Sequence, residues 1–159
     1  MGFVLHPRLN ADTAVIADWR LSRVLVMNDK RFAWIVLVPR RSNVSEIFDL
    51  DDASRAILTS EIARVAEQIK VWANTIGICD KINIGMIGNL VPQLHVHVVA
   101  RSRGDAAWPG TVWGAGKAIP YGAAELSRVV TELRDILKSR AGPGTYIAMT
   151  WARAESPRP

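Results

Sequence analysis

Two short apolar runs near the start of the chain predict a β-hairpin. Residues 24–27 (Val-Leu-Val-Met) form the first run, and residues 32–38 form a second one that contains Trp, Ile and Val and ends at Pro39. Runs of this length that are rich in β-branched and aromatic residues favour strands. The polar residues 28–30 between them are typical of a turn. We therefore expect two antiparallel strands with a tight connection.

A helical period follows over residues 51–75. Its apolar residues recur at steps of four and three and so share one face: Leu58, Ile62, Val65, Ile69 and Trp72. Asp51 and Asp52 stand at the predicted start, where carboxylates bind free amides and meet the positive end of the helix dipole. Gly77 ends the pattern.

The rest of the pattern completes a small α+β protein. The remaining predicted elements are strands over residues 81–86 and 94–100, an irregular segment over 101–121, a helix over 123–138, a strand over 145–151 and a tail over 152–159. We expect an antiparallel sheet of about five strands with two main helices. This domain covers residues 1–140, and residues 141–159 form a partly flexible C-terminal extension.

Composition narrows the class of protein. The chain has 159 residues, of which 49% are hydrophobic, and this suits one globular domain. Its longest apolar run, residues 32–38, is far shorter than the roughly 18 residues that a membrane span needs. No basic segment followed by a long apolar stretch opens the chain, so we expect no secretory signal. The single Cys79 excludes an internal disulfide and favours a cytoplasmic protein.

The net charge of +5 favours anionic small molecules as partners. The sequence has no basic run with interleaved aromatic residues, so we do not expect nucleic acid as a partner.

Residues 93–99 (Gln-Leu-His-Val-His-Val-Val) carry the candidate chemistry. Alternate residues of a strand share a face, so Gln93, His95 and His97 point one way while Leu94 and its apolar alternates point to the core. The histidines then stand at exposed strand positions. Three uses are open: a metal site, a phosphoesterase with two His-x-Thr/Ser motifs, and nucleophilic attack on phosphorus. The metal site lacks a nearby third ligand, and the second use lacks the hydroxyl residues.

The segment resembles the signature of the histidine triad (HIT) family, which is His-φ-His-φ-His-φ-φ with φ apolar. It matches everywhere except at Gln93, which stands in the place of the first histidine. Further matches are Asn83-Ile84-Gly85, Gly88-Asn89, Leu37-Val38-Pro39-Arg40 and the basic Arg101 after the motif. The resemblance covers about residues 20–101. It implies a HIT-like fold, a homodimer, no cofactor and a nucleotide or another phosphate-containing small molecule as substrate.

The resemblance also implies roles. His95 matches the nucleophile that attacks the α-phosphate and forms a covalent nucleotidyl-histidine. His97 matches the last triad histidine, which contacts phosphate oxygens. Gln93, in the place of the first triad histidine, completes the expected catalytic set. The expected substrate-binding residues are Met27, Asn83, Gly88, Asn89, Leu90, Val91 and Arg101. An apolar residue near Val26 or Met27 stands in place of the acidic residue that holds the ribose in the family.

Several departures keep two functions open. Leu90 replaces a hydroxyl residue, and Trp34 stands where hydrolases of the family place a histidine. The chain is therefore expected to be either a nucleotide hydrolase or transferase, or a nucleotide-binding module with little turnover. Trp108 and Trp113 follow the motif and are expected either to close the pocket or reach a partner subunit, or simply to pack.

Overall fold

The computed structural model describes residues 2–77 and 79–138. Its strands are β1 (Thr13–Asp18), β2 (Ser22–Met27), β3 (Ala33–Pro39), β4 (Lys81–Gly85) and β5 (Val96–Arg101). The helices are α1 (Pro7–Asp12), the 3-10 turn η1 (Ile47–Asp49), α2 (Asp52–Ile76) and α3 (Ala123–Lys138). The predicted strand over 145–151, the tail and the extension over 141–159 lie outside the described residues.

The five strands form one antiparallel sheet in the order β1-β2-β3-β5-β4. The predicted α+β class and the predicted hairpin (β2 and β3) are therefore confirmed. The described sheet reaches five strands through β1, which the sequence prediction did not include. Its apolar stretch, Ala-Val-Ile-Ala, is half alanine, which favours strands only weakly, and Val15 is exposed. Pairing with β2, such as Ala14 opposite Val26, makes this segment a strand.

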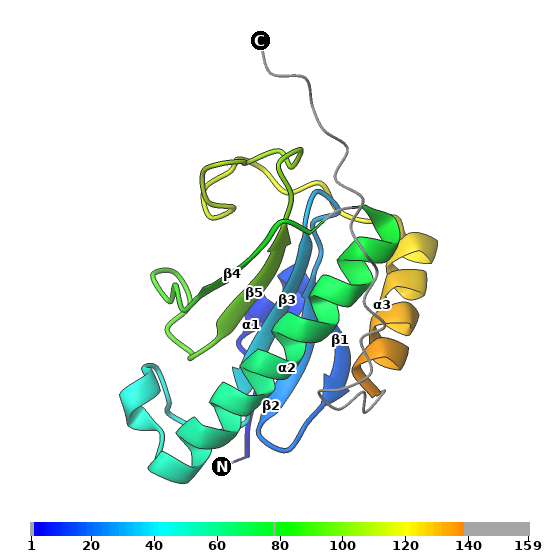
Figure 1. Ribbon diagram of the computed structural model, residues 1–159. Helices are drawn as coiled ribbons and strands as arrows, with labels where there is room; N and C mark the ends of the chain where they lie inside the picture. Colours follow the sequence, from blue (N-terminus) through cyan, green and yellow to red (C-terminus); the bar gives the residue numbers. More distant parts are fainter. Residues whose placement is uncertain (1, 78, 139–159) are drawn as a thin grey trace.

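The sheet is covered on both faces, so its central strands are buried from both sides. Alternate residues of β3 belong to two apolar clusters: Ile35 and Leu37 face α2 and α3, whereas Val36 and Val38 face the opposite layer. Figure 1 shows α2 and α3 side by side over one face, with α1 behind the sheet. Burial on both sides explains why residues 32–38 read as a continuous apolar run rather than an alternating one.

The two predicted long helices are confirmed within about a residue at their ends. Asp51 caps α2 by accepting a hydrogen bond from the Ser54 amide at 2.6 Å. Farther along α2, the buried Glu61 accepts hydrogen bonds from the amides of Leu21 and Ser22, and so joins this helix to the start of β2. Within the described part of the chain, no helix has the length and apolar character needed to cross a bilayer.

Candidate active site

The two histidines of the motif lie next to each other at the start of β5. Their ring centroids are 4.8 Å apart, with an angle of 83° between the planes. The expectation of exposed positions is wrong, because His95 and His97 are only 5% and 6% exposed. The sheet face on which they lie is covered by α1 and by the irregular segment over 101–121, which the hydropathy pattern does not reveal.

A backbone contact determines the tautomer of His95. Its Nδ1 lies 2.7 Å from the carbonyl oxygen of Gln93. A carbonyl oxygen can only accept a hydrogen bond, so Nδ1 of His95 must donate it. In the neutral ring the other nitrogen, Nε2, then carries the lone pair. His95 is therefore prepared to act as a nucleophile through Nε2.

His97 has the opposite tautomer. The indole Nε1 of Trp34, on the neighbouring strand β3, lies 3.0 Å from Nδ1 of His97. Indole N–H can only donate, so Nδ1 of His97 accepts and the proton of the neutral ring lies on Nε2. The two adjacent rings thus offer a lone pair from one Nε2 and a hydrogen-bond donor from the other.

Both rings are held in their neutral forms. Burial, with a further contribution from the charge of His95, lowers the pKa of His97 to about 3. Burial also lowers the pKa of His95, which the charge of His6 lowers further and the backbone contact with Gln93 partly restores. At neutral pH His97 is therefore a hydrogen-bond donor, whereas His95 keeps its lone pair.

A cavity of about 640 Å³ opens over these rings. Its wall combines four parts of the chain: α1, the β2–β3 turn with Met27, the loop between β4 and β5, and the irregular segment with Trp113. The volume is of the size that holds a nucleotide-sized ligand. A second hollow of about 500 Å³ lies between Trp19 and α2 and contains no histidine.

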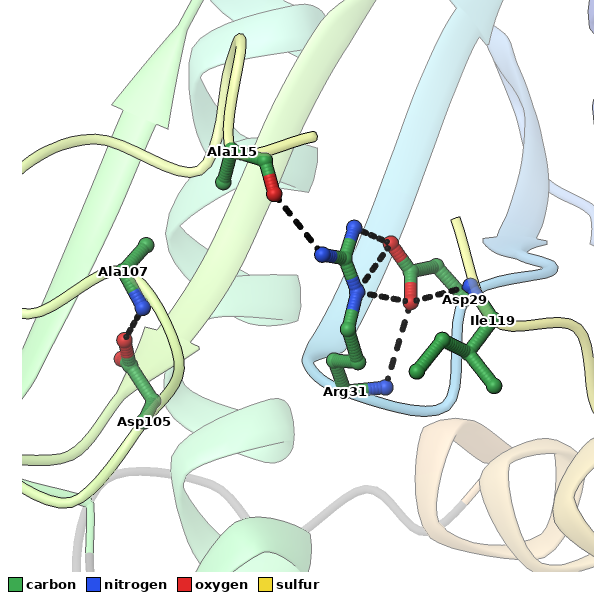
Figure 2. A network of polar contacts seen from close by, with 6 residues as sticks. All are labelled: Asp29, Arg31, Asp105, Ala107, Ala115 and Ile119. Atoms are coloured by element: carbon green, nitrogen blue, oxygen red, sulfur yellow. Dashed lines mark hydrogen bonds and ion pairs between the residues drawn. The ribbon is translucent and has the colours of Figure 1, made fainter. Parts of the chain in front are cut away.

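Arg31 joins the β2–β3 turn to the irregular segment (Figure 2). Its guanidinium pairs with the buried Asp29, with Nη2 2.6 Å from a carboxylate oxygen, and its Nη1 donates to the carbonyl of Ala115 at 2.8 Å. Burial alone would raise the pKa of Asp29, but the hydrogen bonds from Arg31 and from the Ile119 amide, with the charge of Arg31, outweigh it and lower that pKa. The pair holds this wall of the cavity in place.

Gly85 makes room for Trp113. A Cβ at Gly85 would lie 2.9 Å from the Trp113 ring, which is too close for any other residue. The Trp113 ring in turn packs against His97, with 5.8 Å between the two ring centroids. The match to Asn83-Ile84-Gly85 therefore includes one glycine that the packing of the site requires. Trp108, by contrast, does not line the cavity and lies over the guanidinium of Arg101.

The structure brings only part of the expected substrate-binding set to the cavity. Met27, Asn89, Leu90 and Val91 line it together with the two histidines. Gly88, Gln93, Asn83 and Arg101 do not line it. Arg101 is 2% exposed, and its guanidinium binds Asp105 and the side-chain oxygen of Asn83. Since that guanidinium already has partners, its contacts are those of a structural group.

Sequence reasoning missed α1, which contributes Arg8 and Leu9 to the cavity. The six-residue helix is too short for a hydrophobic period to show. One local signal existed: Pro7 stands at the first helical position after His6, whose Nδ1 accepts a hydrogen bond from the Arg8 amide. Proline is frequent at this position of helices.

The sequence left a metal site open as an alternative. Among residues 2–77 and 79–138, no three His, Cys, Asp or Glu side chains are grouped so that they could hold a metal ion.

Comparison with known proteins identifies the family. A family model described as HIT domain matches residues 8–104, which is more than half of the chain. The chain belongs to the HIT family. This HIT protein is similar to a histidine triad protein from Bradyrhizobium japonicum, with a TM-score of 0.80 and 45% identity over 86% of this chain and 99% of that one. A histidine triad protein from Sinorhizobium meliloti gives a TM-score of 0.79 and 41% identity, over 84% of this chain and 96% of that one.

Among curated proteins, the AP-4-A phosphorylase of Mycobacterium tuberculosis is 38% identical over 88 residues, which are 54% of this HIT protein and 44% of the relative. The match thus spans less than half of the relative's length.

Proposed function

We propose that this HIT protein is a nucleotide hydrolase or nucleotidyl transferase that works through a covalent intermediate on His95. The observation that carries the proposal is the bond between Nδ1 of His95 and the Gln93 carbonyl, because it leaves the lone pair on Nε2 of a ring that lines the cavity. The nucleotide-processing name of the curated relative supports the same class of substrate. In this proposal Gln93 stands in the place of the first triad histidine.

The reaction has two balanced steps. Nε2 of His95 attacks the α-phosphorus, a nitrogen–phosphorus bond forms, and the bond to the leaving group breaks with its electron pair on the leaving oxygen. Water or another acceptor then attacks the phosphorus, the electron pair of the nitrogen–phosphorus bond returns to Nε2 of His95, and the proton that the acceptor loses passes to the solvent or to the departed leaving group. While the ring carries the nucleotidyl group it is cationic, and the Gln93 carbonyl stabilises it by accepting the hydrogen bond from Nδ1.

His97 assists by donating a hydrogen bond. Its Nε2–H donates to a non-bridging phosphate oxygen, where negative charge is concentrated in the transition state. Burial lowers the pKa of this ring to about 3 in the free site, so it meets the substrate as a neutral hydrogen-bond donor. Asn89, Leu90 and Val91 provide backbone groups at the same cavity, and Met27 lies against the sugar.

The test is a search for the adduct. The protein is mixed with dinucleoside polyphosphates and nucleoside phosphoramidates, stopped in alkaline denaturant because the nitrogen–phosphorus bond is acid-labile, and analysed by peptide mass spectrometry. We expect a nucleotidyl group on His95. His95→Asn, which suits a buried site better than truncation to Ala, should abolish it, whereas His97→Asn should only slow it. Nucleotide binding by the wild type with no adduct and no turnover would favour the binding-module alternative.

We also propose that the protein is a cytoplasmic homodimer with one domain over residues 1–140. The edge strand β4 supports dimerisation, because its outer side has no strand partner among the described residues and Ile84 is exposed on it. Light scattering of the wild type and of Ile84→Glu tests this, with a dimer expected only for the former.

A further inference from the structure

Both polar atoms of the Gln93 side chain bind the N-terminal segment, which we define as residues 4–12. Its Nε2 donates to the carbonyl of Val4 at 2.9 Å, and its Oε1 accepts from the amide of His6 at 2.9 Å. The two backbone groups that bind this amide lie two residues apart, in Val4 and His6. The side chain of Gln93 therefore pairs with the segment in the way that the backbone of a neighbouring strand would. Gln93 does not line the cavity, so its amide is not placed to reach a phosphate oxygen bound there.

The segment that Gln93 holds continues directly into α1, which forms one wall of the cavity. His6 caps this helix, and the next turn places Arg8 and Leu9 at the cavity. Leu9 is buried in the apolar cluster on the same sheet face as the histidines. The position of this wall therefore depends on where residues 4–6 are held.

Arg8 is the cation that α1 brings to the cavity. It pairs with Asp12 at 3.6 Å, and both side chains are more than half exposed. Such exposed pairs contribute little, so Arg8 can exchange this partner for an anionic ligand at small cost. Arg31, the other arginine of the cavity wall, is held by the buried Asp29.

Gln93 also contacts the nucleophile, but through its backbone. Its carbonyl binds Nδ1 of His95, while its side chain binds the N-terminal segment. A change of side chain therefore leaves the contact with the nucleophile in place and releases only α1. Substitution of the side chain can therefore test the contact with the N-terminal segment without removing the contact with His95.

We propose that Gln93 is a positioning residue that sets substrate affinity through the N-terminal segment, by holding α1 and Arg8 at the cavity for the anionic part of the nucleotide. The inference rests on the proposed function for its substrate class. It differs from a triad role, in which the side chain at this position would act on the reacting phosphate.

Two pairs of variants test the inference in the full chain at pH 8, above the range in which imidazole ionises. Gln93→Met removes both hydrogen bonds at similar length, and Asn10→Ala, an exposed change on α1 that does not line the cavity, is its control. His6→Pro removes the amide donor, and the backbone already suits proline with φ at −55°. His6→Ala is its control, since it also lacks the imidazole but keeps the amide.

We expect Gln93→Met to raise KM about five- to tenfold with kcat changed less than twofold, because it removes two hydrogen bonds and each accounts for about two- to threefold in affinity. His6→Pro should raise KM about two- to fivefold over His6→Ala. Hydrogen exchange of the α1 amides should be faster in Gln93→Met than in Asn10→Ala, and faster in His6→Pro than in His6→Ala, because both His6 variants lose the imidazole cap on Arg8.

A tenfold fall in kcat for Gln93→Met at unchanged KM would overturn the inference, because the side chain would then act on the reacting atoms. Unchanged exchange in α1 would also overturn it. Exchange needs no turnover, and the dissociation constant of ADP replaces KM if the protein forms no adduct. Failure of the proposed function is thus distinguishable from failure of this inference.

Discussion

Trp34 determines which nitrogen of His97 carries the proton. Trp34→Phe keeps an aromatic ring but removes the donor to Nδ1, so the Nε2–H tautomer loses its main support. We expect turnover to fall about five- to tenfold, which corresponds to roughly one hydrogen bond. The ¹⁵N chemical shifts of the His97 ring report the tautomer directly. Shifts that are identical in the wild type and Trp34→Phe would contradict this assignment.

The charge state of His95 should set the acidic limit of activity. The nucleophile must be neutral, and burial together with His6 lowers the pKa of His95, so kcat/KM should persist below about pH 6.5, the ordinary value for histidine. Removing the charge of His6 raises the pKa of His95. In His6→Ala the acidic limb should therefore move to higher pH.

Few other groups near His95 change charge in this range. His97 stays neutral, and the charged cavity residues Arg8, Asp12, Asp29 and Arg31 are paired with one another. A pH profile of kcat/KM and an NMR titration of His95 should agree. A limb that stays in place in His6→Ala would show that His6 does not act on the nucleophile.

At the scale of elements, Arg101 joins the end of β5 to β4 and to the loop that follows. Its guanidinium binds the carboxylate of Asp105 at 2.6 Å and the side chain of Asn83 at 2.8 Å. Burial by itself would raise the pKa of Asp105, but the hydrogen bonds from Arg101 and the backbone lower it. The pair is almost completely buried, so loss of one partner leaves an uncompensated charge inside the protein.

Arg101→Ala should therefore lower the free energy of unfolding by about 3–5 kcal/mol. The matched change Arg103→Ala removes a guanidinium that is 82% exposed and 3.8 Å from Asp80, and should alter stability by no more than about 0.5 kcal/mol. Urea unfolding at pH 7 measures both. Equal, small effects would show that Arg101 does not hold these elements together.

At the scale of the whole molecule, the buried imidazoles should make the fold acid-sensitive. His97 has a pKa of about 3 in the native state, whereas an unfolded histidine titrates near 6.5. Between these values the unfolded chain binds a proton that the native protein does not. Stability therefore falls as pH falls through this window, by roughly 1.4 kcal/mol per unit, and His95 contributes in the same direction.

We expect the free energy of unfolding to be about 2 kcal/mol lower at pH 5 than at pH 7, with a smaller difference in His97→Asn. Asp29 and Asp105, whose pKa values are also lowered, lose their contributions only below the ordinary range of carboxylates. Urea unfolding at the two pH values makes the comparison. Equal differences in the two proteins would mean that His97 does not titrate as a buried group.

The sequence alone determined the elements with a strong period and the strand that carries the chemistry. The helix over 51–75 was predicted because its apolar stripe repeats over many turns, and the hairpin because β-branched runs flank a polar turn. The alternation within residues 93–99 also placed Leu94 toward the core and both histidines together. These features depend on neighbours within a few positions, so a local pattern is enough to reveal them.

The protonation and burial of the site depend on contacts between segments that are distant in the sequence. Trp34 and His97, which settle a tautomer, are 63 positions apart, and His6 and Gln93, which hold α1, are 87 positions apart. The burial of the histidines, the partners of Arg101 and the strand identity of β1 likewise depend on segments that meet only when the chain is folded. Hydrogen-bond direction and desolvation act through space, and the periodicity of a sequence records only the face on which a residue lies.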